Sequence, residues 1–322
     1  MEPTTPTSFT PEIDSETLSR NLQELRQNIT SAPTYHNTFR VDNDFLSRFL
    51  FCSKQDIEKS QIRYFNYYKC ITQIPGAESI EKGDPREIVE LIKTIRQQNL
   101  KPLMNFYGFD KFGRGIIVME PGNIDLSSPK SYYSAFKFFF LGRNKIRKKS
   151  QNMLFPKLRP KTLFSNALNS MVMMSIIYLD FLLENIPELK THGIVSIKDH
   201  GFISLKVLKT IVSDRKIMGL NADLFQNGMP LIIKSAIGVN EPAMFGMVWK
   251  VIKVFLSKKM ISRMMFFGKN HEKVQVVLGG AEFVPDILDG GLRSPSLEYS
   301  LTDEVLEHHI LKAFPSKIEN YQ

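Results

Sequence analysis

Apolar residues in the first third of the chain recur at helical spacing. Asp14 and Ser15 are typical of an N-cap, and the leucines and isoleucine of the next four turns lie on one face. Further helices are predicted from Asp42, from Asp56 to Ile71, and from Asp84 to about Gln98. The pattern therefore predicts an N-terminal helical lobe over residues 14–99, after a Pro- and Thr-rich disordered tail at 1–13.

The pattern then changes to short apolar runs. PLMNFYGFD and GIIVME flank a Gly-containing turn and predict neighbouring strands, and GIVSIKD, LIIKSAIG and MMFFG predict three more. Helices are predicted between them, over about 166–185, 205–218 and from 240 onward. This alternation is typical of an α/β fold with a mostly parallel sheet flanked by helices. Residues 294–322 are predicted to form a C-terminal tail with a final helix.

Charge is concentrated in one segment. The 322 residues carry 42 Lys and Arg against 33 Asp and Glu, a net charge of +9. Residues 126–179 hold ten of the basic residues and no acidic one, which leaves 32 basic against 33 acidic residues elsewhere. A nearly neutral protein therefore carries one cationic segment.

Several classes of protein are excluded or disfavoured by composition and motifs. Two cysteines, Cys52 and Cys70, cannot build a disulfide framework and are expected to be buried thiols. No secretory signal and no uninterrupted apolar span are found, which favours a cytoplasmic protein. Motifs for nucleotide cofactors, nucleophilic hydrolases and zinc are missing, and six scattered histidines lack partners at ligand spacing. We expect neither enzyme activity nor a bound cofactor or metal.

Four stretches carry a resemblance. They are DFLSRFLFCSKQDIEKSQIRYFNYYK, FDKFGRGIIVMEPGNID, HGIVSIKDHGFISL, and MPLIIKSAIGVNEPAMFGMVWKVIKVFLSKKMISRM with VPDILDGGL. In this order they resemble the CRAL-TRIO lipid-binding family, especially its alpha-tocopherol transfer and retinaldehyde-binding branch. The resemblance implies a lipid-binding domain over residues 100–293, with helices and sheet enclosing a hydrophobic cavity behind the helical lobe.

In this family a gate helix covers the cavity, and it matches residues 240–257. Asn240 is expected to cap this helix and Pro242 to occupy its first turn, followed by a broad apolar face. Residues expected to line the cavity are Ile176, Phe181, Ile194, Ile197, Phe245, Val248, Trp249 and Ile252. Each of them is of a type that could equally fill an ordinary core.

Cations near the gate suggest membrane docking. In the tocopherol branch, residues that bind a phosphoinositide head group fall at positions matching Lys234, Lys259 and Arg263. Further cations of that branch fall here at Ile232, Phe51 and Ser53, so half of the cluster is missing. Lys253 matches a lysine that contacts phosphatidylinositol in the fungal phospholipid-transfer branch.

The leading functional hypothesis is a non-enzymatic carrier that moves a hydrophobic small molecule between membranes. The cargo would be tocopherol- or retinoid-like or a phospholipid, and phosphoinositides would assist docking of a monomer peripherally at the membrane. The alternative is a phosphoinositide-reading recruitment or signalling module that transfers no cargo. Compared with the resembled family, the segment at about 131–164 is a basic insert, because its relatives have a short connection there. Three interpretations of this insert stay open: anionic membrane binding, a nucleic-acid or nuclear-targeting patch, which is the least favoured, and a disordered or mispredicted segment. We expect that deleting residues 131–163 leaves ligand binding intact.

Overall fold

The computed structural model describes residues 14–35, 39–73, 104–120, 175–201, 203 and 215–293. The tail at 1–13, the helix expected at 84–98, the basic insert and the helix expected after residue 300 lie outside these described residues. The domain boundaries drawn near residues 99 and 293 therefore remain predictions.

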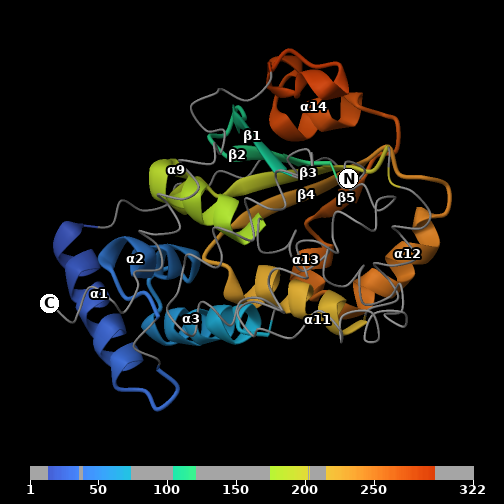
Figure 1. Ribbon diagram of the computed structural model, residues 1–322. Coiled ribbons are helices and arrows are strands. Elements are labelled where there is room, and N and C mark those ends of the chain that lie inside the picture. The colour runs from blue at the N-terminus through green and yellow to red at the C-terminus, as the bar shows by residue number, and fades with distance from the viewer. Residues whose placement is uncertain are drawn as a thin grey trace, which may run out of the picture.

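The described part of the N-terminal lobe contains three helices at the predicted places (Figure 1): α1 (Ser15–Thr30), α2 (Asn43–Cys52) and α3 (Ile57–Ile71). Each begins after an aspartate whose carboxylate accepts a hydrogen bond from the backbone N–H three residues later. The caps are Asp14, Asp42 and Asp56. Such caps satisfy N–H groups that the first helical turn leaves free, which explains why the three starts were legible in the sequence.

A five-stranded sheet follows in simple order. Its strands are β1 (Met104–Phe109), β2 (Gly115–Met119), β3 (Ile194–Asp199), β4 (Ile233–Val239) and β5 (Met264–Phe266). β1 and β2 pair antiparallel, and β2 through β5 pair parallel, each with the next strand in the chain. The predicted mostly parallel α/β sheet is confirmed.

The helices that connect the parallel strands lie on one face of the sheet (Figure 1). They include helical residues 175–185, α9 (Glu188–His192), α11 (Arg215–Asp223), α12 (Phe245–Ile252) and α13 (Lys258–Ile261). Right-handed crossovers that always step in the same direction place their helices on the same side. The opposite face is covered by α14 (Glu272–Leu278), a helix that the sequence pattern did not predict.

Helix α11 extends beyond its expected end. The prediction ended this helix at Met218, whereas α11 runs to Asp223 and continues as a π-helical turn, Leu224–Gly228. This extension packs against α3, and a Cβ on Gly228 would lie 3.1 Å from the backbone of Tyr67. Close packing against the lobe, which a sequence window does not contain, therefore lengthens the helix.

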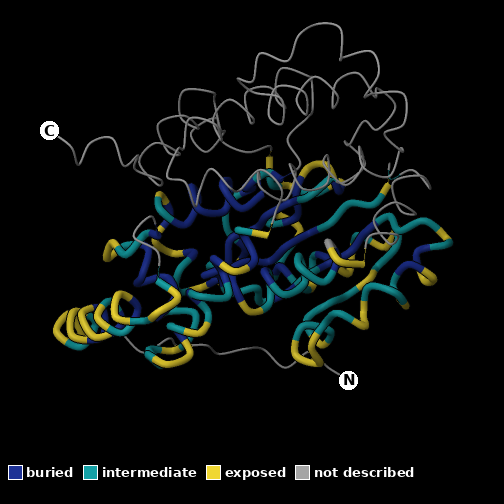
Figure 2. The backbone as a smooth tube through the Cα atoms, turned by 60° about the horizontal axis from the view of Figure 1, so that its bottom comes forward, coloured by how far each residue is buried: buried dark blue, intermediate teal, exposed yellow. Residues whose placement is uncertain are grey.

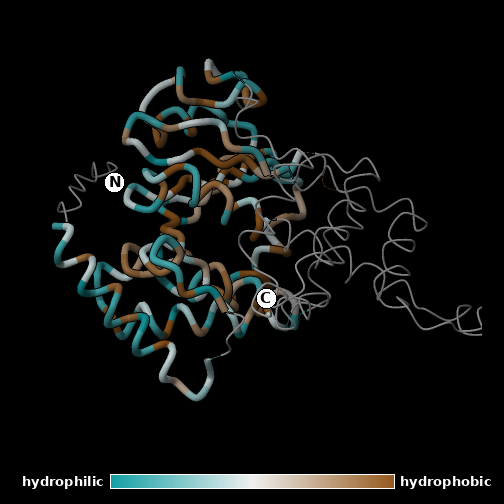
Figure 3. Tube along the Cα trace, turned by 60° about the vertical axis from the view of Figure 1, so that its left-hand side comes forward, coloured by the Kyte–Doolittle hydropathy of each residue, from teal (hydrophilic) through white to brown (hydrophobic). Residues whose placement is uncertain are grey.

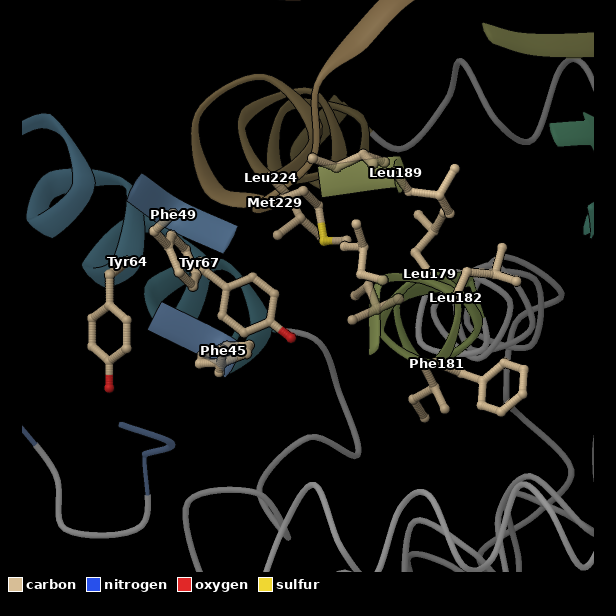
Figure 4. Close-up of a cluster of buried hydrophobic side chains, with 14 of the residues drawn as sticks. Phe45, Phe49, Tyr64, Tyr67, Leu179, Phe181, Leu182, Leu189, Leu224 and Met229 are labelled. Carbon is tan, nitrogen blue, oxygen red and sulfur yellow. The ribbon is translucent and has the colours of Figure 1, made fainter. Parts of the chain in front are cut away.

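Two hydrophobic cores lie on opposite faces of the sheet. The larger joins the lobe to helical residues 175–185 and to the sheet face that carries Phe106, Ile117 and Ile194. Figure 4 shows the aromatic residues of α2 and α3 opposite Leu179 and Leu182. The smaller core packs the other sheet face against Val274 and Leu278 of α14. Buried residues concentrate between these layers (Figure 2), and the hydrophobic ones gather in the central strands (Figure 3).

Candidate functional site

The segment after β4 turns sharply before it becomes helical. Asn240 adopts a left-handed backbone with φ 54°, and its N–H donates to the carbonyl of Gly268 at 2.7 Å. Its side chain donates to Asp199 Oδ1 at 2.9 Å and lies 3.2 Å from His271 Nε2. Hydrogen bonds of Asn240 therefore connect the ends of β3 and β4 to the loop after β5.

The predicted cap and bounds of the gate helix are consequently wrong. α12 begins at Phe245, five residues later than expected, and Met244 at its N-cap makes no side-chain cap hydrogen bond. The helix ends at Ile252, a 3-10 turn spans Lys253–Phe255, and Leu256 is extended. The left-handed Asn240 cannot be an N-cap, because that position requires an extended backbone.

Helix α12 carries exposed apolar side chains on its outer side, next to the exposed Lys250, as well as apolar ones on its inner side. Phe245 and Val248 are buried, whereas Trp249 and Ile252 are half-buried. On the outer side Met247 is 63% exposed, and Val254 in the following turn is 71% exposed. A helix that only completed a core would have polar residues at these outer positions.

Aromatic rings hold the inner side of α12 against the sheet. The Phe266 ring of β5 lies 5.2 Å from that of Phe245 and 4.8 Å from that of Trp249, measured between centroids. The His200 ring, one residue beyond β3, lies 4.9 Å from Phe245. Thus α12 sits over the carboxyl ends of β3 and β5, the edge at which parallel sheets usually bind ligands.

The predicted lining residues fall into three places. Ile176, Phe181 and Ile194 lie in the larger core with the helical lobe. Phe245, Val248, Trp249 and Ile252 lie on α12. Ile197 packs in the smaller core beneath α14, on the face of the sheet that α12 does not cover. Side chains alternate along a strand, so Ile194 and Ile197 point to opposite faces, and Ile197 is outside the site around α12.

The three predicted head-group cations do come together. Burial, then the neighbouring charge of Arg263, lowers the pKa of Lys234. The positive charge of Arg263 is also the main cause of the lowered pKa of Lys259. Arg263 is itself held by a 2.7 Å hydrogen bond from its Nη1 to the carbonyl of Ile233. Like charges are therefore gathered on this surface, and among the described residues no carboxylate contributes to the pKa shift of either lysine.

Two further cations of this surface come from the lobe, and sequence reasoning missed them. Lys54 depresses the pKa values of both Lys234 and Lys259, and Arg63 depresses that of Lys259. Lys54 lies in the turn between α2 and α3. Arg63 lies on α3 and donates to the carbonyl of Gln226 in the π-helical segment and to that of Met229 directly after it. We call Lys54, Arg63, Lys234, Lys259 and Arg263 the cationic group.

Lys54 stands next to Ser53, one of the positions at which the resembled branch has a cation. A one-residue offset in a turn moves a long side chain by a few ångströms, which a lysine can span. A search for cations within one residue of each expected position would have found Lys54. Lys253, the alternative head-group residue, is exposed in the 3-10 turn after α12.

Features of metal or thiol catalysis are not found among the described residues. No group of three or more His, Cys, Asp or Glu side chains in these ranges could hold a metal ion. Burial raises the pKa of the Cys52 thiol to about 12 and that of Cys70 to about 11, so neither is a thiolate at neutral pH. In the described ranges no helix has the length and apolar content needed to cross a bilayer.

A family model, the CRAL/TRIO domain, matches residues 103–279, which include all five strands, α12 and the cations at Lys234, Lys259 and Arg263. The match covers more than half of the chain, and the chain belongs to this family. Membership supports lipid binding or transfer as its general function and a hydrophobic lipid as its ligand. Proteins of this family are generally non-enzymatic.

Solved structures show similarity at low sequence identity. The crystal structure of Sfh5 is 10% identical, with a TM-score of 0.47, over 96% of this chain and 99% of that one. No curated protein sequence matches the chain significantly.

Proposed function

We propose that the protein carries a hydrophobic small molecule between membranes, with α12 and its flanking turns as the gate. The observation that carries this proposal is the pair of exposed apolar side chains, Met247 and Val254, on a helix whose inner side packs over the sheet. A lipid in water costs about 0.8 kcal/mol per exposed CH₂, so a carrier must enclose its cargo. A gate with exposed apolar residues beside a lysine, Lys250, can enter the bilayer interface while its inner side releases the cargo.

Docking is assigned to the cationic group. Lys258 and Lys259 begin α13 directly after the gate, and Lys234, Arg263 and the two lobe cations extend the same field. Each cation near an anionic membrane contributes about 1 kcal/mol. The phosphoinositide-reading role expected for Lys234, Lys259 and Arg263 is part of this proposal, and Lys54 and Arg63 supply charges that the sequence comparison found missing.

The cargo class follows from the resemblance and is proposed on that ground. It is tocopherol- or retinoid-like, as in the alpha-tocopherol transfer and retinaldehyde-binding branch, or a phospholipid, in which case Lys253 would contact the head group. Ile176, Phe181, Ile194 and the inner side of α12 are the proposed lining. Mass spectrometry of lipid extracted from the purified chain tests this directly. A stoichiometric hydrophobic ligand is expected, and a chain that copurifies with none and takes up none would refute the carrier.

Docking is tested by cosedimentation with phosphatidylcholine vesicles, with and without phosphatidylinositol bisphosphate. Lys259→Ala together with Lys54→Asn removes two cations, and Asn tolerates the left-handed backbone at position 54. The loss of about 2 kcal/mol predicts roughly 30-fold weaker binding to the anionic vesicles. Lys273→Ala, which removes an exposed cation from α14, is the matched control and should bind normally. Equal binding by all variants would reject the assigned docking surface.

The second candidate function is a recruitment module that reads phosphoinositides and transfers no cargo. The cationic group favours this recruitment module, because a positively charged surface can bind phosphoinositides without an enclosed ligand. An empty cavity combined with head-group-dependent vesicle binding would support this module against the carrier.

A further inference from the structure

A row of three strand residues leads from β3 to the gate. Lys198 on β3 pairs in register with Gly238 on β4, and Gly238 pairs with Phe266 on β5. Residues paired in this way project from the same face of a sheet. The Phe266 ring contacts Phe245 and Trp249 of α12. Lys198 is therefore on the face that the gate covers, at the carboxyl end of its strand.

The central position of this row carries no side chain. A Cβ added to Gly238 would lie 2.6 Å from the Phe266 ring and 2.5 Å from Glu241 Oε1, so these two side chains occupy the space above Gly238 between Lys198 and Phe266. The other oxygen of Glu241 accepts the N–H of Gly268 at 2.8 Å, which fixes the carboxylate toward the β5 loop. Glu241 forms no ion pair with Lys198.

Lys198 is half-buried and, among the described residues, has neither a hydrogen-bond partner nor an ion-pair partner. Burial, not a neighbouring charge, lowers its pKa. An ammonium group withdrawn from water without a counterion is unfavourable, and proteins usually pair such a group or place it against a ligand. The residue that precedes it on this face, Ser196, is also polar and contacts the sulfur of Met119 at 3.8 Å.

A second polar atom lies close by. His200 Nδ1 is buried and has no hydrogen-bond partner within the described part of the chain, while the ring packs on Phe245. Burial and the charge of Lys198 lower the His200 pKa to about 4, so the ring is neutral at physiological pH and Nδ1 can donate or accept. Lys198 and His200 thus lie close together beneath α12, and Glu241 Oε1, a buried oxygen that also has no hydrogen-bond partner in the described ranges, lies near Gly238. A few polar groups beneath an apolar helix are the arrangement of a pocket that orients a ligand by a small number of polar contacts.

We propose that Lys198 anchors the head group of the cargo beneath α12, and that this cargo is an acidic amphiphile with a carboxylate or phosphate head. The proposal rests on the carrier function proposed above and narrows its ligand. The negative oxygens of the head group accept hydrogen bonds from the ammonium, His200 Nδ1 provides a further contact, and the hydrocarbon chain extends along the apolar inner side of α12.

The test measures binding to the purified, delipidated full chain. Oleate and oleyl alcohol have the same hydrocarbon chain and differ in the head group, as do dioleoyl phosphatidic acid and dioleoylglycerol. Displacement of a neutral fluorescent lipid gives the affinity of each. We expect the chain to prefer the acidic member of one pair by about tenfold or more, because hydrogen bonds to charged groups are the stronger ones. The pair that shows the preference identifies the head group as carboxylate or phosphate.

Three variants separate anchoring from a structural role. Lys198→Met keeps the length of the side chain and removes the charge, so the preference should fall to about one while affinity for the neutral lipid is retained. Lys198→Arg should keep the preference, and Lys273→Met on α14 should not change it. Melting temperatures verify that each variant is folded, and removal of an unpaired charge should not lower them.

Different results overturn different claims. A chain that binds both members of each pair equally, or a Lys198→Met variant that retains the acidic preference, would overturn the anchor and leave the carrier standing. A chain that binds none of the four lipids would overturn the carrier and the anchor with it.

Discussion

Asp180, in the helical residues 175–185, joins the lobe to the sheet domain through buried charges, and its substitution is the most severe that we predict. Its carboxylate accepts a hydrogen bond from Arg48 Nη1 and another, at 3.1 Å, from Arg40 Nη1. The Arg48 side chain has no exposed surface and also bonds Asp44, which in turn binds Lys190. Burial lowers the pKa values of Arg40 and Arg48, but the negative charge of Asp180 raises them, and both pKa values are raised overall.

The Asp180→Asn substitution removes one charge and almost no volume. Arg40 keeps Asp42 as an ion-pair partner. Arg48 keeps the partly exposed Asp44 as an ion-pair partner and the 3.3 Å hydrogen bond from its Nη1 to the backbone carbonyl of residue 180. Removal of one partner from a buried ion pair costs about 3–5 kcal/mol, because the remaining charge is left without compensation. Domains of this kind have a free energy of unfolding of about 5–15 kcal/mol, so the variant is expected to lose a large part of its stability.

Urea unfolding followed by circular dichroism measures this loss as a shift of the midpoint at unchanged slope. Asp289→Asn is the matched control, because its carboxylate is 96% exposed beside His271 and its loss should cost less than about 0.5 kcal/mol. The double variant Arg48→Met, Asp180→Leu should recover much of the stability, because it removes both charges. A change for Asp180→Asn as small as that for Asp289→Asn would refute the argument.

Three further predictions concern the sheet and the gate. The folded pKa of His200, about 4, lies below its unfolded value, so the unfolded chain takes up the proton first as pH falls. As pH falls from 6.5 to about 4, the free energy of unfolding should therefore decrease more in the wild type than in His200→Gln, by at most about 3 kcal/mol. Urea unfolding at a series of pH values measures this difference, and parallel pH profiles for the two proteins would contradict the prediction. Gly193→Ala, at φ +72° with a Cβ 2.3 Å from the Ile232 carbonyl, should lower the free energy of unfolding by about 2 kcal/mol or more, and an unchanged melting temperature would argue against this strain. Met247→Ser with Val254→Ser should reduce partitioning into vesicles by at least about tenfold without lowering the melting temperature, and unaltered partitioning would exclude α12 as the inserting element.

Elements with local signals were predictable from sequence. The lobe helices begin at aspartates that cap through their own side chains, and their apolar periodicity matches the buried face of α1 at Leu22, Leu25 and Ile29. The strands are predictable because short apolar runs lie between turns, and their parallel pairing follows from the helices between them. In both cases the information lies within a few residues along the chain.

Features that depend on distant contacts were not predictable. The sequence predicts that Asn240 caps a helix. In the structure it adopts a left-handed turn, which is stabilised by hydrogen bonds to Gly268, Asp199 and His271 in other segments. α14 is seven residues long and is held to the sheet by Val274 and Leu278, a pattern too short to distinguish from a loop. The contribution of Lys54 and Arg63 to the cationic group likewise depends on how the lobe packs against β4.

We propose separate physical roles for the two kinds of charge in this protein, which would explain why the total charge is a poor guide to function. The cations at Lys54, Lys234 and Lys259 repel one another at the surface, and such a field is stabilised when an anionic membrane approaches. Lys198 is isolated beneath the gate, and a head group small enough to enter would stabilise it. An acidic lipid in the bilayer would neutralise the surface cations. Once it has entered the protein, its head group would neutralise Lys198. The same head-group chemistry would then favour both docking and loading, and the gate between them would need to open only at the membrane.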